Sequence, residues 1–137
     1  MTRWLERIIL GASGLVLAAV GIVATFATDA FYGVYSIDIS GSRELASELR
    51  AVGVVLLLTG MLILCGLVWR SWVFPAAVIA ATVALGLALG RAGSALVDGS
   101  PDSSIVTAGV IELLLGAGAL WVAVRNRPRP RPRPRSQ

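Results

Sequence analysis

The chain of 137 residues contains no histidine and no lysine, and Cys65 is its single cysteine. Without histidine the chain has no imidazole base and no imidazole metal ligand, and without lysine it has no amine for a Schiff base. One cysteine leaves no intrachain disulfide. We therefore predict no catalytic residues, no metal site and no cofactor, which favours a protein that is not an enzyme.

Charged residues are also scarce in the chain. Charged residues make up 15% of the chain and hydrophobic residues 56%, with a mean hydropathy of +0.81. Soluble globular domains carry about 25% charged and 45–50% apolar residues. Both values depart in the direction of a membrane protein, and they exclude an ordinary water-soluble enzyme.

Four apolar runs of 18 to 20 residues account for most of the chain: 8–27, 51–69, 73–90 and 105–124. A helix of about 20 residues crosses a hydrocarbon core of about 30 Å. The sequence therefore predicts an all-α fold, a four-helix transmembrane bundle within one domain over residues 1–124. The first run is longer than the apolar region of a typical signal peptide, so we expect it to be retained as a helix.

The arginines predict the orientation of the bundle. Nine of the twelve precede the first run, lie in the short turn after the second, or follow the fourth, and three lie on the other side. Cytoplasmic segments of membrane proteins carry the excess of positive charge. We therefore expect a multi-pass protein of the bacterial cytoplasmic (inner) membrane with both termini in the cytoplasm.

The outer connection between the first two runs carries one cap and three aromatic residues. Ser42 is a plausible N-cap, after which the chain from Arg43 can continue as helix into the second run. We expect the loop itself to lie along the membrane interface. Its aromatic residues are Phe31, Tyr32 and Tyr35.

Glu112 is the one charged residue inside the apolar runs, and it lies in the fourth. A carboxylate at this depth costs about 2.5–3.5 kcal/mol by insertion scales, so it should face protein or water rather than lipid. Gly109 and Gly116 share its face and would let another helix approach and shield it. Glu112 is either a structural ion-pair partner or a ligand contact and proton acceptor, and the residues alone leave both interpretations open.

Arg50 and Arg91 are the expected partners of Glu112, because each lies at the outer end of an apolar run. Arg91, Ser94 and Asp98 recur at helical spacing and would form a polar stripe. Two arginines with one carboxylate would leave a positive surplus that attracts an anionic headgroup or a carboxylate. The alternative is that both arginines simply extend to the interface at helix ends. The candidate ligand site thus comprises Arg50, Arg91, Ser94, Asp98 and Glu112.

Small residues recur at intervals that suit close helix packing. In the third run Gly86 and Gly90 match the pattern of two small residues four positions apart. We expect such pairs to mark packing within the chain.

The tail, residues 125–137, alternates arginine and proline and cannot be helical. We predict a disordered, extended arm. Its arginines could gain about 1 kcal/mol each from anionic lipid headgroups, or serve only to fix topology. No aromatic residues interleave for stacking, so we expect no nucleic acid. The six lipid-contact candidates are Arg125, Arg127, Arg129, Arg131, Arg133 and Arg135.

Several short segments resemble, in order and spacing, the uncharacterised bacterial family called domain of unknown function 4345. They are Glu48-Leu49-Arg50-Ala51-Val52-Gly53, Leu87-Ala88-Leu89-Gly90-Arg91, Asp98-Gly99-Ser100-Pro101 and Glu112-Leu113. The resemblance covers residues 35–124. It implies a four-helix membrane protein in which Arg50, Arg91 and Glu112 form the shared polar set, and it implies no activity. The layout is also similar, at the level of the fold, to DoxX-like four-helix proteins.

Two functions fit these patterns. The first is a non-enzymatic accessory or interaction protein of the bilayer, within a larger membrane complex, because the short loops leave no room for a soluble catalytic domain. The second is a binder, carrier or membrane enzyme for a small amphipathic ligand (lipid, quinone or organic acid) near the outer leaflet. In that case Arg50 and Arg91 would hold the polar head, and Glu112 would accept a proton.

Overall fold

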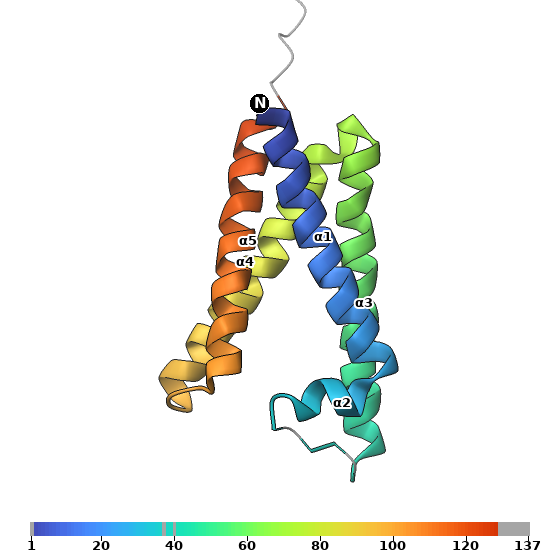
Figure 1. The fold of residues 1–137 in the computed structure, drawn as a ribbon, viewed down its shortest axis with the longest axis vertical. Helices are drawn as coiled ribbons and strands as arrows, with labels where there is room; N and C mark the ends of the chain where they lie inside the picture. Colours follow the sequence, from blue (N-terminus) through green and yellow to red (C-terminus); the bar gives the residue numbers. More distant parts are fainter. Residues whose placement is uncertain (1, 37, 40, 129–137) are drawn as a thin grey trace, which may run out of the picture.

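The computed structural model describes residues 2–36, 38–39 and 41–128, and every regular element in this part of the chain is helical. Four long helices are joined by one short helix and one tight turn (Figure 1). The long helices are α1 (Thr2–Phe26), α3 (Arg43–Val68), α4 (Val73–Val97) and α5 (Ser103–Arg125). The short elements are α2 (Thr28–Gly33) and the 3-10 turn η1 (Arg70–Trp72).

The sequence explains where these helices begin and end. The Ser42 side chain accepts a hydrogen bond from the Leu45 N–H at 3.2 Å, which confirms Ser42 as the N-cap of α3. Pro75 lies in the first turn of α4, where a missing N–H costs little. The same helix ends before Gly99, whose φ of +99° favours glycine, and Pro101 follows. It therefore runs seven residues past Gly90, the predicted end of the third apolar run.

Helices α1 and α3 cross with their backbones in contact. A Cβ on Gly21 would lie 2.7 Å from the Gly53 carbonyl oxygen, and one on Gly60 would lie 2.7 Å from the Gly14 carbonyl oxygen. Any side chain at these positions would force the helices apart. In lipid, where apolar burial drives no association, such close backbone contact is a main source of helix packing.

Helices α4 and α5 form the second pair. Gly116 admits Leu85 of α4, because a Cβ on Gly116 would lie 2.7 Å from Leu85 Cγ. Ala119 and Ala123 continue the same face and are buried. The small-residue face expected beside Glu112 is therefore the face that packs on α4.

The glycine pair predicted to pack in the third run does not pack within the described chain. Gly86 and Gly90 are exposed on α4, and an added Cβ on either would meet no atom within 4 Å. That prediction was wrong for a physical reason. Helix α4 turns an alanine face inward instead, made of Ala76, Ala77, Ala80, Ala81 and Ala84.

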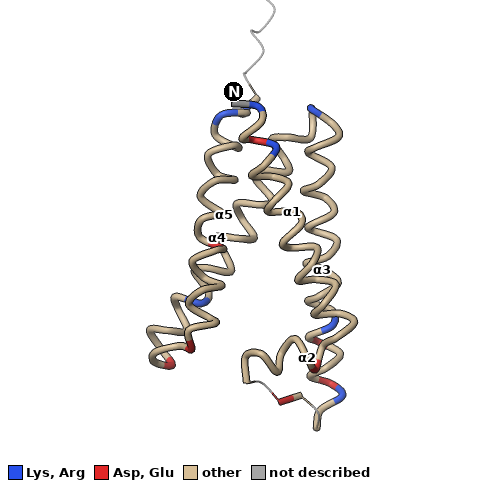
Figure 2. Tube along the Cα trace, viewed as in Figure 1, with Lys and Arg blue, Asp and Glu red and all other residues tan. Residues whose placement is uncertain are grey.

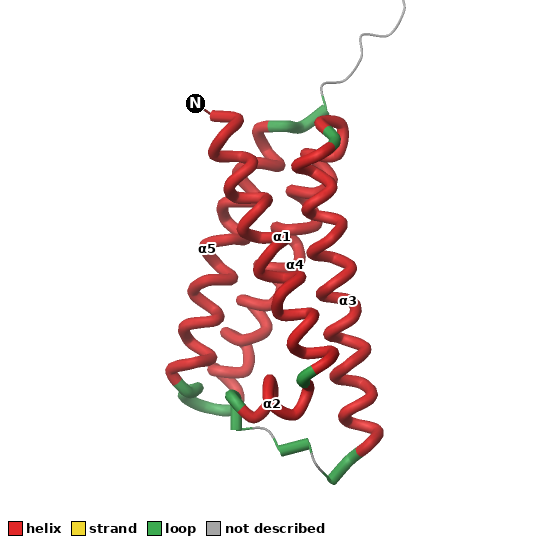
Figure 3. The backbone as a smooth tube through the Cα atoms, turned by 45° about the vertical axis from the view of Figure 1, so that its right-hand side comes forward, coloured by secondary structure: helices red, strands yellow, loops and turns green. Residues whose placement is uncertain are grey.

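The two helix pairs meet at one end of the bundle and diverge toward the other (Figures 1 and 3). We call these the amino-terminal end and the α2 end, after the N-terminus and the short helix found there. The core at the amino-terminal end contains Leu10, Ile63, Ala76, Ala80 and Val122, all at most 1% exposed. At the α2 end, the short helix lies between the diverging pairs and helps to enclose the space described below (Figure 3).

The outer faces of the long helices are apolar and exposed, as lipid requires. In the described part of the chain four helices are long and apolar enough to cross a membrane. All four tryptophans, Trp4, Trp69, Trp72 and Trp121, lie toward the amino-terminal end. Tryptophan is enriched at headgroup level. The chain is a multi-pass membrane protein with the four-helix fold that the sequence predicts.

Candidate binding cavity

A bidentate ion pair joins α4 to α5. Arg91 Nε donates to Glu112 Oε2 at 2.9 Å, and Arg91 Nη2 donates to Glu112 Oε1 at 3.1 Å. The side chains are 31% and 17% exposed. Parallel N–H···O bonds of this kind are the strongest arrangement open to an arginine and a carboxylate. The pair compensates both charges at a depth where either alone would be costly.

The local sequence shapes the space around this pair. A Cβ on Gly109 would lie 3.6 Å from Arg91 Cδ, and Gly116 lets α4 and α5 approach one turn beyond Glu112. Arg91 itself lies six residues before the end of α4, about 9 Å inside it at 1.5 Å per residue. The guanidinium therefore reaches the carboxylate within the bundle rather than extending to the interface.

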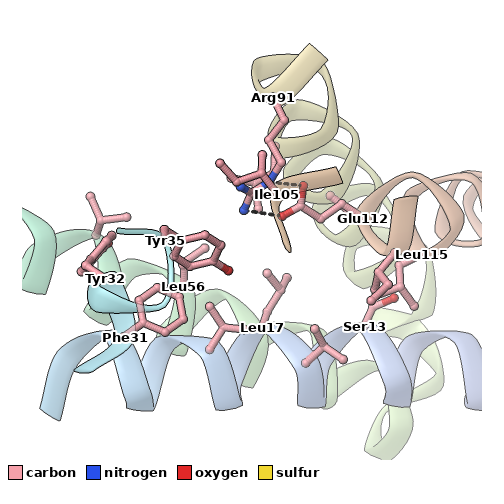
Figure 4. Close-up of a pocket in the computed structure, with 16 residues that line it drawn as sticks. Ser13, Leu17, Phe31, Tyr32, Tyr35, Leu56, Arg91, Ile105, Glu112 and Leu115 are labelled. Atoms are coloured by element: carbon pink, nitrogen blue, oxygen red, sulfur yellow. Dashed lines mark hydrogen bonds and ion pairs between the residues drawn. The ribbon is translucent and has the colours of Figure 1, made fainter. Parts of the chain in front are cut away.

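The ion pair borders a cavity of about 270 Å³ between the diverging helix pairs (Figure 4). Every long helix and the α2 segment contribute to its walls. Its charged wall residues are Arg91 and Glu112, and its other polar wall residues are Ser13, Tyr32 and Tyr35. The remaining lining side chains are apolar: Val16, Leu17, Val20, Phe31, Val52, Leu56, Ala84, Leu87, Ile105, Ile111 and Leu115.

An aromatic cluster from the α2 segment forms one side of this cavity. Phe31 meets Tyr32 and Tyr35 edge to face, with ring centroids 5.0 and 5.6 Å apart. Tyr35 also lies beneath Arg91, whose Cζ is 5.9 Å from the ring centroid. Burial, and to a lesser extent Tyr35, raises the pKa of Tyr32. The sequence prediction placed these rings along the interface and missed that they line a cavity.

Ser13 is the residue that the sequence analysis did not single out. It is 2% exposed, and among the described residues its Oγ is the one buried side-chain polar atom without a hydrogen-bond partner. It lines the cavity on the side away from the aromatic cluster, next to Leu115 (Figure 4). A buried hydroxyl without a partner calls for an explanation. A single serine among small residues in an apolar run carries no signal by which it could have been found.

The structure does not bring the other predicted site residues to the ion pair. Arg50 donates from Nε to Thr28 Oγ1 at 3.2 Å, so its partner is the hydroxyl of the first residue of α2 and not Glu112. Ser94 and Asp98 are exposed at the end of α4 and do not line the cavity. The pair α1–α3 and the pair α4–α5 diverge at this end. Arg50 and Glu112 therefore lie in different helix pairs.

The first residue of the predicted tail belongs to the last helix. Arg125 is the last residue of α5; its Nε lies 3.5 Å from Glu6 Oε1 and its Cζ 5.3 Å from the Trp121 ring centroid. Arg127 is exposed. The remaining predicted lipid-contact residues, Arg129, Arg131, Arg133 and Arg135, lie outside the described residues, as does the predicted disorder of that segment.

The geometry defines a class of protein: a four-helix membrane protein whose splayed end encloses an apolar cavity with a charge-balanced polar wall. Comparison with known families then identifies the family of the chain. The family model described as "Domain of unknown function (DUF4345)" matches residues 5–123, so the chain belongs to this family, as the sequence predicted. No curated protein matches, and no solved structure matches. The similarity to DoxX-like proteins is not shown.

Proposed function

We propose that this protein binds a small, neutral amphipathic molecule in the cavity beside Arg91 and Glu112. One observation carries the proposal: an apolar cavity of about 270 Å³ has an ion pair and unpaired hydrogen-bonding capacity in its wall. Ligand sites commonly combine apolar walls with a few polar groups that orient the ligand. This supports the second of the two functions considered from the sequence over the accessory-protein function.

The charge balance of the cavity wall favours a ligand whose polar group is neutral. An arginine has five N–H donors, and Glu112 accepts from Nε and Nη2, which leaves further guanidinium N–H groups for a ligand. Because Glu112 already compensates Arg91, a ligand carboxylate would bring a buried charge without a partner, which is costly. A neutral oxygen acceptor such as a carbonyl meets the donors without that cost. The positive surplus expected from two arginines is absent, since Arg50 is bonded elsewhere.

The volume of the cavity and the Ser13 hydroxyl indicate the size and shape of the ligand. Ligand pockets commonly measure about 300–1,000 Å³, so a cavity of about 270 Å³ suits a ring or a headgroup rather than a whole phospholipid. The Ser13 hydroxyl offers a second donor across the apolar walls from the aromatic cluster. Among lipids, quinones and organic acids, a quinone headgroup combines a neutral flat ring with two carbonyl acceptors and fits this wall best.

Duroquinone and durene form a matched pair of probes, since the hydrocarbon has the same methylated ring without the two carbonyl oxygens. We expect calorimetric titration of the detergent-solubilised protein to show duroquinone binding at least about tenfold more tightly than durene. The reason is that a hydrogen bond to a charged group contributes about 1.5–3 kcal/mol. Equal binding of the two probes would contradict a role for the polar wall. Tighter binding of octanoate than of duroquinone would contradict the charge-balance argument.

We further propose that the protein lies in the bacterial cytoplasmic membrane with its amino-terminal end toward the cytoplasm. Figure 2 shows arginines gathered at that end and acidic residues mostly at the other, and the positive-inside rule supports this orientation. In a Cys65→Ser background, Ser100→Cys should react with a membrane-impermeant maleimide added to intact spheroplasts, and Arg127→Cys should react only after lysis. The reverse pattern would refute the orientation.

A further inference from the structure

A second cavity, of about 280 Å³, lies at the amino-terminal end, between α1 and the turn from α3 to α4. It shares no lining residue with the cavity beside Arg91, and its wall carries more positive charge. Three arginines line it, Arg3 and Arg7 from α1 and Arg70 from η1. Its other wall residues are Glu6, Leu10, Gly66, Leu67, Val68, Val73 and Asn126.

The charges of this cavity are not balanced within its wall. Glu6 is the one acidic lining residue, and it pairs with Arg125, which is outside the lining, at 3.5 Å. Arg3 and Arg7 stand four positions apart on one helix face, where like charges repel each other. An anion between these arginines would relieve that repulsion.

One of the three guanidiniums is already oriented by the backbone. Arg7 Nη2 donates to the Leu67 carbonyl oxygen at 3.1 Å, which holds the side chain across the gap between α1 and the end of α3. Its other N–H groups remain for a ligand, since an arginine has five. Several such donors around one space are the usual recognition of a phosphate.

The surroundings indicate where that phosphate comes from. The inner wall is apolar and includes the buried Leu10, so the space passes from charged at the helix ends to apolar within the bundle. The exposed Trp69 and Trp72 flank Arg70 and place this turn at headgroup level. Basic pockets between transmembrane helices bind the headgroups of anionic lipids.

We propose that this cavity binds the phosphate of an anionic glycerophospholipid, held by Arg3, Arg7 and Arg70, with the acyl chains against the apolar helix surface. Its three arginines lie outside the predicted tail of residues 125–137, of which Asn126 is the one described residue that lines the cavity. The site is also independent of the proposed ligand of the first cavity, so the two proposals can fail separately.

Native mass spectrometry of the full-length protein in mild detergent tests the site, with palmitoyl-oleoyl phosphatidylglycerol and the matching phosphatidylcholine as probes. We expect the wild type to bind one phosphatidylglycerol at least tenfold more tightly than phosphatidylcholine. Arg3→Gln and Arg70→Gln should each weaken the first phosphatidylglycerol by about fivefold, which corresponds to about 1 kcal/mol. Arg127→Gln, a loss of the same charge at the same end but outside the cavity, should weaken it by less than twofold.

Three results would overturn the proposal. Equal binding of the two lipids would show that the arginines do not select a net negative charge. An equal loss in Arg127→Gln and Arg70→Gln would show a diffuse attraction rather than a site. Displacement of the bound phosphatidylglycerol by millimolar inorganic phosphate would assign the cavity to free phosphate instead of a lipid. Because Arg3 and Arg70 are exposed, both variants should fold, and a thermal unfolding scan of each controls for that.

Discussion

Replacing Glu112 by glutamine is expected to lower the free energy of unfolding by about 3 kcal/mol, because it leaves Arg91 inside the bundle without its carboxylate. Removing one partner of a buried pair costs about 3–5 kcal/mol. The lower end applies here, since the Arg91 side chain is 31% exposed and partly solvated. Equilibrium unfolding in mixed micelles with increasing SDS measures the change.

A double-mutant cycle separates the contribution of the ion pair from the cost of leaving one charge without its partner. The Arg91→Gln/Glu112→Gln variant contains no unpaired charge and should recover at least half of the stability that the Glu112→Gln variant loses. Glu48→Gln, a matched change at an exposed position of α3, should alter stability by less than about 0.5 kcal/mol. If Glu112→Gln were as stable as Glu48→Gln, the ion pair would have no structural role.

Gly21→Ala is expected to destabilise the protein by about 3 kcal/mol or more. An added Cβ would meet the backbone of α3, at the Leu57 N–H and 2.7 Å from the Gly53 carbonyl oxygen. Backbone atoms cannot move aside as a side chain can, so α1 and α3 would have to separate along their length. Overpacking of side chains alone costs about 1–3 kcal/mol. The same SDS titration measures the loss.

Gly86→Ala is the matched control for this substitution. The change is chemically identical, but Gly86 is exposed on α4 and an added Cβ would meet nothing within 4 Å. Replacing an exposed helical glycine by alanine should leave the stability unchanged or raise it by up to about 1 kcal/mol. If both variants lost stability equally, the packing of α1 on α3 would be different from the one described.

The sequence predicted most of the helical fold because each step rests on local information. Run length indicates a membrane span, and Ser42 followed by a helical segment indicates a cap; both are properties of neighbouring residues. The high cost of an isolated carboxylate in lipid likewise indicated that Glu112 needs a partner in the protein. None of these inferences requires knowledge of how the helices are arranged.

The remaining features depend on that arrangement. Arg50 and Arg91 look alike in sequence, and only the divergence of the two helix pairs separates Arg50 from Glu112. Gly86 and Gly90 match the pattern of two small residues four positions apart as well as Gly14 and Ala18 do, yet only the latter two face another helix. Ser13 became visible as a site residue only once its hydroxyl was seen to lack a partner beside the cavity.

The most direct test of a ligand site at the ion pair is calorimetric titration of duroquinone into the Arg91→Gln/Glu112→Gln variant. This variant keeps the charge balance, should keep the fold, and removes the guanidinium donors. Ser94→Ala, an exposed change three residues from Arg91 and outside the cavity, is the control. We predict that the control binds like the wild type and that the double variant loses at least tenfold in affinity. Unchanged binding by the double variant would contradict the site.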